Sequence, residues 1–402
     1  MSIVINILIA LYLLHWPNMI LHYSSYTVEF IKTPSLMLTI ILLGISGYKY
    51  AYLFRNSIII LFLIAVNYII INDIYFHSYI LKSILYAFIC GAVFKMPKLV
   101  FRFMHVNMIV GGVLATQALI LIIFWAIDYQ LSYDSVIFID SNSHRYFNFM
   151  FGFGNDYNYF RLTSYFTESN RFAYFLTPAL FVSFYFMQTT QKYIYKYVFS
   201  VIAVSIAFTF SVFGFFSILS GVFLYYIYYR NISIKTIIYY GVVLVTLVTI
   251  YNIFSDYYDF MFNKSGSYLD RYTGILSKIS TVKSHPWGLP EKTISYVTTA
   301  KYYGNSTLTI LNWAVSGGLQ SAALLILLLF SWIKSIHSLL TSKNHFMIII
   351  GCATFALLLE QSFYGTYYEY YFLSVMAIVT VLQYMVKRDD LRLYTLLNQS
   401  PK

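Results

Sequence analysis

Long runs of apolar residues recur along the whole chain, separated by more polar segments. Twelve such runs lie near residues 2–22, 34–48, 57–73, 79–94, 103–127, 172–188, 197–210, 212–229, 236–254, 306–333, 345–363 and 369–386. We divide the stretch 197–229 in two because it is too long for one crossing and has a polar break at Thr209 to Ser211. About 20 apolar residues span the hydrocarbon core of a bilayer. The pattern therefore predicts an all-α polytopic membrane protein, a single transmembrane domain over residues 1–402 with about 12 helices.

The composition fits a lipid environment. Of the 402 residues, 59% are apolar or aromatic and 10% are charged, and the mean hydropathy is +0.68. Soluble domains contain about 45–50% apolar and about 25% charged residues, so a soluble protein is excluded. A membrane β-barrel is excluded as well, because its strands alternate over about ten residues whereas these runs are continuous.

Basic residues predict which side of the membrane each segment faces. With the N-terminus in the cytoplasm, fifteen of the 26 lysines and arginines fall on inner segments, and only Lys32 and Lys82 fall on short outer loops. The other nine lie in two long outer loops, 128–171 and 255–305, and long loops are translocated largely regardless of charge. Both termini are therefore expected to be cytoplasmic. The net charge of +11 then reflects topology, and no nucleic-acid partner is expected.

Polar residues are concentrated in the two long loops. Because loops of this length are uncommon without a function, we expect the functional residues to lie there. The first ends in Arg161, Glu168, Asn170 and Arg171, directly before an apolar run. A cap at Ser169 or Asn170 is expected to aim backbone N–H groups outward and form an anion site. The arginines add donors suited to phosphate. The alternative is an ordinary interfacial ion pair between Arg161 and Glu168.

The second loop contains Arg271, Lys278 and Lys283 on a possible helix, followed by His285 and a rigid turn, Pro286-Trp-Gly-Leu-Pro290. The loop is mildly basic and faces a membrane whose lipid substrates can be anionic. The turn is expected to hold His285 in place, although a lone loop histidine is more often simply solvated. No metal-binding His/Cys spacing, nucleotide-binding glycine loop or Gly-x-Ser-x-Gly motif is present, so the sequence predicts no metal or nucleotide cofactor.

Four segments, in this order, resemble the Wzy-type O-antigen polymerases, relatives of the O-antigen ligases. They are Arg161-x-x-Ser-x-Phe-x-Glu168-x-Asn170, Phe208-Thr-Phe-Ser-Val-Phe-Gly214, His285-Pro-Trp-Gly288, and Asn305-Ser-Thr-Leu308 followed by Gly317-Gly318-Leu319. The sequence departs from the family pattern at Ser164, Val212, Pro290 and Gly304. The resemblance covers the whole predicted topology and implies an architecture like that of GT-C glycosyltransferases.

The resemblance implies a glycosyltransferase of lipopolysaccharide biosynthesis in the bacterial inner membrane. Such an enzyme joins oligosaccharides carried on undecaprenyl pyrophosphate, which serves as donor and acceptor carrier, and it works with a polysaccharide chain-length regulator. The residues that it assigns to the leaving pyrophosphate are Arg161 and Arg271, with Arg171 and Lys283 in support. Glu168 or His285 takes the acceptor proton, and Asn170 and Asn305 bind substrate.

Two other functions are open at this point. One is the related ligase, which delivers finished glycan to lipid A–core. The other belongs to a different class, a flippase for lipid-linked oligosaccharides, which is similar in size and span number but lacks two long outer loops with arginines.

Overall fold

The computed structural model is almost entirely helical. It describes residues 2–15, 42–45, 47–72, 76–127, 149–151, 160–162, 169–209, 211–230, 265–289, 309–342, 344–364, 370–388 and 390. The helices are α1 (Ser2–His15), η2 (Tyr52–Phe54), α3 (Arg55–Asn72), α4 (Phe76–Lys95), α5 (Lys98–Ile127), α7 (Ser169–Thr190), α8 (Tyr193–Phe208), α9 (Val212–Arg230), α11 (Ser265–Ser284), α13 (Thr309–Leu340), α14 (His345–Tyr364) and α15 (Tyr370–Lys387). Two short strands, β1 (Phe149–Phe151) and β2 (Phe160–Leu162), pair antiparallel.

Most predicted apolar runs are helices whose bounds lie within a few residues of those expected. One differs more clearly, because α13 continues to Leu340; of the run 2–22, the structure describes α1 as far as His15. The run predicted at 236–254 lies outside the described residues. Within the described part of the chain, the helices that are long and apolar enough to cross a membrane are Gly47–Asn67, Lys98–Ile120, Thr309–Leu340 and His345–Ser362. The fold is thus that of a helical protein with several long apolar helices, compatible with a membrane protein, and the count of twelve spans stays a prediction.

The predicted break between residues 197 and 229 is confirmed. α8 ends at Phe208 and α9 begins at Val212. The Thr209 hydroxyl donates to the carbonyl of Ile206 at 2.7 Å, and the Gly214 N–H donates to Ser211 Oγ at 3.1 Å. A serine that accepts from a backbone N–H three residues later is an N-cap. The local polar residues therefore end one helix and start the next.

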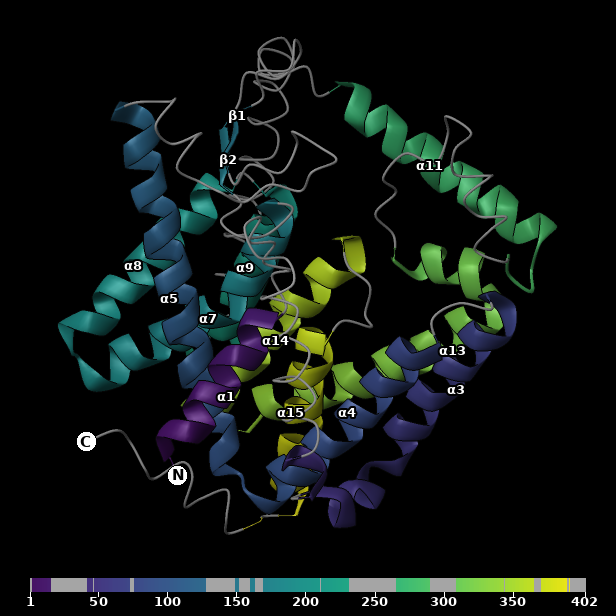
Figure 1. The fold of residues 1–402 in the computed structure, drawn as a ribbon, viewed down its shortest axis with the longest axis horizontal. Coiled ribbons are helices and arrows are strands. Elements are labelled where there is room, and N and C mark those ends of the chain that lie inside the picture. The colour runs from purple at the N-terminus through teal and green to yellow at the C-terminus, as the bar shows by residue number, and fades with distance from the viewer. Residues whose placement is uncertain are drawn as a thin grey trace.

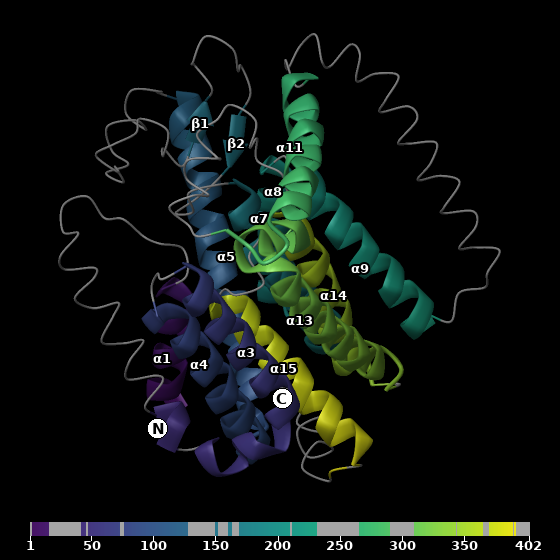
Figure 2. The ribbon, with the colours of Figure 1, turned by 90° about the vertical axis from the view of Figure 1, so that its right-hand side faces the viewer.

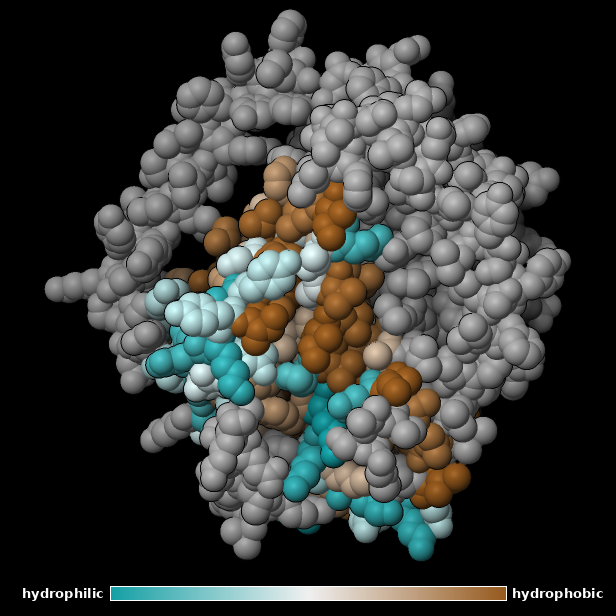
Figure 3. All heavy atoms as spheres, turned by 60° about the vertical axis from the view of Figure 1, so that its left-hand side comes forward, coloured by the Kyte–Doolittle hydropathy of each residue, from teal (hydrophilic) through white to brown (hydrophobic). Residues whose placement is uncertain are grey.

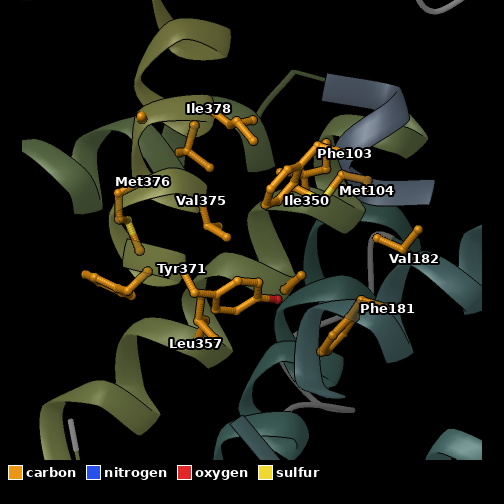
Figure 4. Packing of buried hydrophobic residues seen from close by; sticks show 14 of the residues in the cluster. Phe103, Met104, Phe181, Val182, Ile350, Leu357, Tyr371, Val375, Met376 and Ile378 are labelled. Carbon is orange, nitrogen blue, oxygen red and sulfur yellow. The ribbon is translucent and has the colours of Figure 1, made fainter. Parts of the chain in front are cut away.

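α14 lies in the middle of the bundle and packs against α7, α9 and α13, while α15 packs against α4 and α13. Figure 4 shows the shared core, where the Tyr371 ring of α15 lies beside Leu357 of α14 and its hydroxyl points away from α15. That hydroxyl accepts a hydrogen bond from Asn107 Nδ2 of α5 at 3.0 Å. α14 and the first turns of α15 are almost wholly buried, so the centre of the bundle is formed by helices far apart in the sequence.

The two ends of the bundle differ. Figure 1 shows the start of α1 and the end of α15 at one end of the molecule, and β1, β2 and α11 at the opposite end. Figure 3 shows, on the face that carries α5 and α8, an apolar area bordered by hydrophilic side chains. Exposed apolar residues of these two helices include Ile109 and Val113 of α5 and Val204 of α8. A helix face of this kind is compatible with lipid contact.

Candidate functional site

The most unusual backbone in the described residues is a break inside α13. Gly318 has φ 73° and ψ 174°, a conformation that interrupts the helix and favours glycine. The apolar span predicted over 306–333 is thus present as α13 but contains a break that the sequence did not reveal. The break lies near one end of α13, and Figure 2 shows α11 standing over this part of the helix.

The turn 285–289, which follows α11, fills the break in α13. In an unbroken helix the Val315 carbonyl accepts from the Leu319 N–H. Here Val315 O accepts from Leu289 N at 3.0 Å, and Leu319 N donates to Pro286 O at 2.8 Å. The turn therefore satisfies both backbone groups that the break releases, as a low-dielectric environment requires.

Two glycines allow this close contact. A Cβ on Gly318 would lie 2.5 Å from the carbonyl carbon of Trp287, and a Cβ on Gly288 would lie 2.7 Å from the backbone nitrogen of Gly318. Gly288 also has a positive φ, 95°. The segments His285–Gly288 and Gly317–Leu319, which the sequence analysis singled out separately, are thus in direct contact.

Polar side chains from α3 and α13 add further hydrogen bonds where the turn 285–289 meets the break in α13. Asn67 Nδ2 donates to the Gly317 carbonyl at 2.7 Å and to Ser321 Oγ. Gln320 Nε2 donates to Trp287 O at 3.2 Å and lies 3.4 Å from Asn67 Oδ1. Asn67 therefore links the broken helix to α3, a role that the sequence analysis missed. An asparagine inside the apolar run 57–73 was the available signal.

α11 confirms the helix expected for Arg271, Lys278 and Lys283. The Arg271 side chain lies outside the described residues. Lys278 is buried between α11 and α13, and its Nζ donates to Asn312 Oδ1 at 2.5 Å. Desolvation lowers the pKa of Lys278 to about 8. A second cation, Lys283, is exposed near the end of the helix.

The low pKa of Lys278 leads to a pH prediction. Between about pH 8 and the ordinary lysine pKa near 10.4, the unfolded state binds more protons than the folded state, so stability rises with pH in that window. We expect α11 to dock more tightly on α13 at pH 9.5 than at pH 7, by about 1 kcal/mol after allowance for solvent screening. Limited proteolysis within α11 measures this docking.

The matched variants for that measurement are Lys278→Met and Lys283→Met. Lys278→Met is expected to remove the pH dependence, whereas Lys283→Met, at an exposed position, keeps it. The activity of the protease changes with pH in the same way for both variants. The ratio of their cleavage rates within α11 therefore isolates the effect of Lys278. Equal pH dependence in the two variants would contradict the prediction.

His285 is exposed at the start of the turn. Its Nδ1 lies 2.9 Å from Ser284 Oγ, and the Ser284 hydroxyl also reaches the carbonyls of Ser280 at 3.2 Å and Thr281 at 3.0 Å. When that hydroxyl donates to one of these carbonyls, Ser284 Oγ accepts from His285 Nδ1–H, and Nε2 of His285 then has a lone pair that can take a proton.

The first loop is described only in part. Arg161 lies in β2 with its backbone opposite Met150, and Figure 1 places β2 and α11 at the same end of the molecule. α7 begins at Ser169, so Ser169 and Asn170 lie in its first turn. Arg171 is exposed in that turn. The side chains of Arg161 and Asn170, and residues Glu168 and Asn305, lie outside the described part of the chain.

Glu360 is a buried acid within the predicted apolar run 345–363. It lies inside α14 and is 1% exposed. Thr177 Oγ1 of α7 lies 3.4 Å from Glu360 Oε2, while Glu360 Oε1 has no hydrogen-bond partner among the described residues. The described residues contain no group of three or more His, Cys, Asp or Glu side chains arranged to hold a metal ion.

No family model, curated protein or solved structure matches this chain.

Proposed function

We propose that the protein is a polysaccharide polymerase of the O-antigen type. It joins repeat units carried on undecaprenyl pyrophosphate at the periplasmic face of the bacterial inner membrane. The observation that supports this most is the contact between His285-Pro-Trp-Gly288 and Gly317-Gly318-Leu319. These segments belong to separate motifs of the family resemblance, and their contact is what a shared functional role predicts.

The proposed topology has twelve spans with both termini in the cytoplasm. The start of α1 and the end of α15 lie at one end of the bundle, and the helix α11 and strand β2 lie at the other (Figure 1). This arrangement supports a periplasmic position for both loops. It brings α11, with its cations Arg271, Lys278 and Lys283, to the end of the molecule where a lipid-linked donor presents its pyrophosphate.

The chemistry requires stabilisation of a leaving pyrophosphate. The acceptor hydroxyl oxygen forms a bond to the anomeric carbon of the donor glycan, and the bond from that carbon to the pyrophosphate oxygen breaks with its electron pair. Negative charge therefore grows on the pyrophosphate, and preorganised cations lower the barrier. In the proposal, Arg161 and Arg271 provide this stabilisation, with Arg171 and Lys283 in support. No nucleotide is consumed, because the sugar–pyrophosphate bond already supplies the free energy.

The proton of the acceptor hydroxyl goes to His285 Nε2 or to Glu168. His285 suits this role, because its Nδ1 lies 2.9 Å from Ser284 Oγ, which can orient the ring, and its side chain is exposed. In the proposal a chain-length regulator binds the enzyme and sets how many repeats are joined.

Deletion of the gene followed by gel analysis of lipopolysaccharide tests the proposed function. A polymerase predicts core that bears a single repeat unit, with the ladder of longer bands restored by the wild-type gene. Bare core with polymer on undecaprenyl carrier would instead identify a ligase. Repeat units trapped on the cytoplasmic leaflet would identify a flippase, and either result would overturn the proposal.

A further inference from the structure

α13 carries a row of exposed apolar side chains, which we call its lipid-facing stripe, and this stripe is shorter than the hydrocarbon core of a bilayer. Beyond the break, the exposed apolar residues Leu319, Ile326, Leu327, Phe330 and Ile333 lie on one side of the helix. At 1.5 Å per residue the stripe is about 21 Å long, whereas the hydrocarbon core is about 30 Å thick. Apolar surface about 9 Å long must therefore continue beyond one end of the stripe.

The stripe cannot continue at its far end. Lys334 follows Ile333 directly, and His337 is exposed one turn later. A lysine at this position extends its ammonium toward the headgroups and marks the boundary of the hydrocarbon. The missing apolar surface therefore lies at the other end, beyond Leu319.

That end holds the first segment of α13, in which Ile310 is exposed, and the turn 285–289, which is hydrogen-bonded to α13. Leu319 N is bonded to Pro286 O, and the next residue, Trp287, is 76% exposed although its backbone is held on both sides by α13. A tryptophan is enriched at the level of lipid headgroups because its ring is apolar and its N–H is polar. Exposed Leu276 and Ile279, one turn apart on α11, together with Lys283, give the preceding helix the mixed character of an interfacial segment.

We propose that the turn 285–289 and the end of α11 lie in the headgroup layer of the bilayer, with Trp287 in contact with phospholipid. Lys283 and His285 are then at the depth of lipid phosphates, above the break in α13. The turn is therefore an interfacial surface within the long outer loop predicted at 255–305. This placement holds whatever reaction the protein performs.

Tryptophan fluorescence of the full-length protein in phosphatidylcholine–phosphatidylglycerol vesicles tests the placement. The emission of wild type minus that of Trp287→Phe isolates Trp287. We expect this signal to be quenched about threefold more by lipid with a nitroxide at the headgroup than by lipid with a nitroxide near the acyl terminus, as headgroup-level indoles require. Aqueous iodide is expected to quench it only weakly.

Trp313→Phe is the matched control, because Trp313 lies on the same broken helix but is 3% exposed. Its difference signal is expected to respond to none of the quenchers. Strong iodide quenching of Trp287 without lipid quenching would overturn the proposal. A Trp287 signal that responds instead to polysaccharide released from the host cells would also overturn the proposal, because it would identify a contact with glycan. A signal that changes when the protein is diluted in the bilayer would do the same, because it would identify a contact between copies of the protein. Each outcome is independent of the lipopolysaccharide test above.

Discussion

Replacement of Gly318 by alanine is expected to destabilise the protein by about 3 kcal/mol or more. The backbone of Gly318, with φ 73° and ψ 174°, lies in a region restricted essentially to glycine, where another residue costs about 1–3 kcal/mol. The new Cβ would also lie 2.5 Å from the Trp287 carbonyl carbon. That atom belongs to a backbone held by the Leu319–Pro286 and Leu289–Val315 hydrogen bonds, so relief of the clash requires the turn to leave the break. The backbone groups of Val315 and Leu319 then lose their partners.

The measurement is the melting temperature and the yield of detergent-solubilised protein. Gly351→Ala is the matched control, because its Cβ would meet the side-chain end of Leu340 at 3.0 Å, which can move. We expect the control to lose clearly less stability than Gly318→Ala, because Gly351 lies in α14 without a positive φ and its new Cβ has its closest contacts with a side chain instead of with backbone. A Gly318→Ala protein with the wild-type melting temperature would show that the docked turn contributes little to stability.

Arg271→Ala and Arg161→Ala are each expected to reduce the polymerisation rate about 10-fold to 160-fold. In the proposed reaction each guanidinium makes a charge-assisted hydrogen bond to the leaving pyrophosphate, worth about 1.5–3 kcal/mol. Lysine is expected to restore the rate only partly, because it lacks the bidentate fork. The assay is incorporation of lipid-linked repeat units, extracted from a deletion strain, at matched amounts of enzyme.

Arg388→Ala is the control for the arginine variants. Arg388 follows α15 at the opposite end of the bundle and lies over the Tyr384 ring at 4.6 Å. We expect Arg388→Ala to leave the polymerisation rate unchanged. The variant thereby shows whether the loss of any arginine lowers the rate. Wild-type rates in both Arg161→Ala and Arg271→Ala would exclude these residues from the site.

Most helix positions were predictable because their signals are local. The break at Thr209 to Ser211 follows from hydroxyl groups that cap neighbouring turns, and α11 follows from a segment bounded by a Pro-Gly turn. The broken helix was not predictable in the same way. Gly318 is next to Gly317 in an apolar run, where glycine is tolerated in an intact membrane helix, and only the contact with Gly288 explains its conformation.

Parts of the candidate site depend on pairs that no local pattern reveals. Lys278 meets Asn312 across 34 residues, and Asn67 meets Gly317 across 250 residues. Glu360 meets Thr177 across 183 residues. From the sequence alone, each of these side chains could equally be a solvated lysine or an isolated polar residue near a helix end. Its contacts in the packed bundle show which interpretation holds, and no local pattern reveals those contacts.

The sequence by itself determined the helical, lipid-compatible class of this protein, the places where most helices begin and end, and the segments that hold its polar chemistry. These properties follow from hydrophobicity and capping within one or two helical turns. Only the tertiary structure decided that the turn after α11 enters α13, that an asparagine from α3 supports it, and that one lysine and one glutamate are buried. Those outcomes arise because backbone groups freed in a low-dielectric interior must find partners, and the partners come from segments distant in the chain.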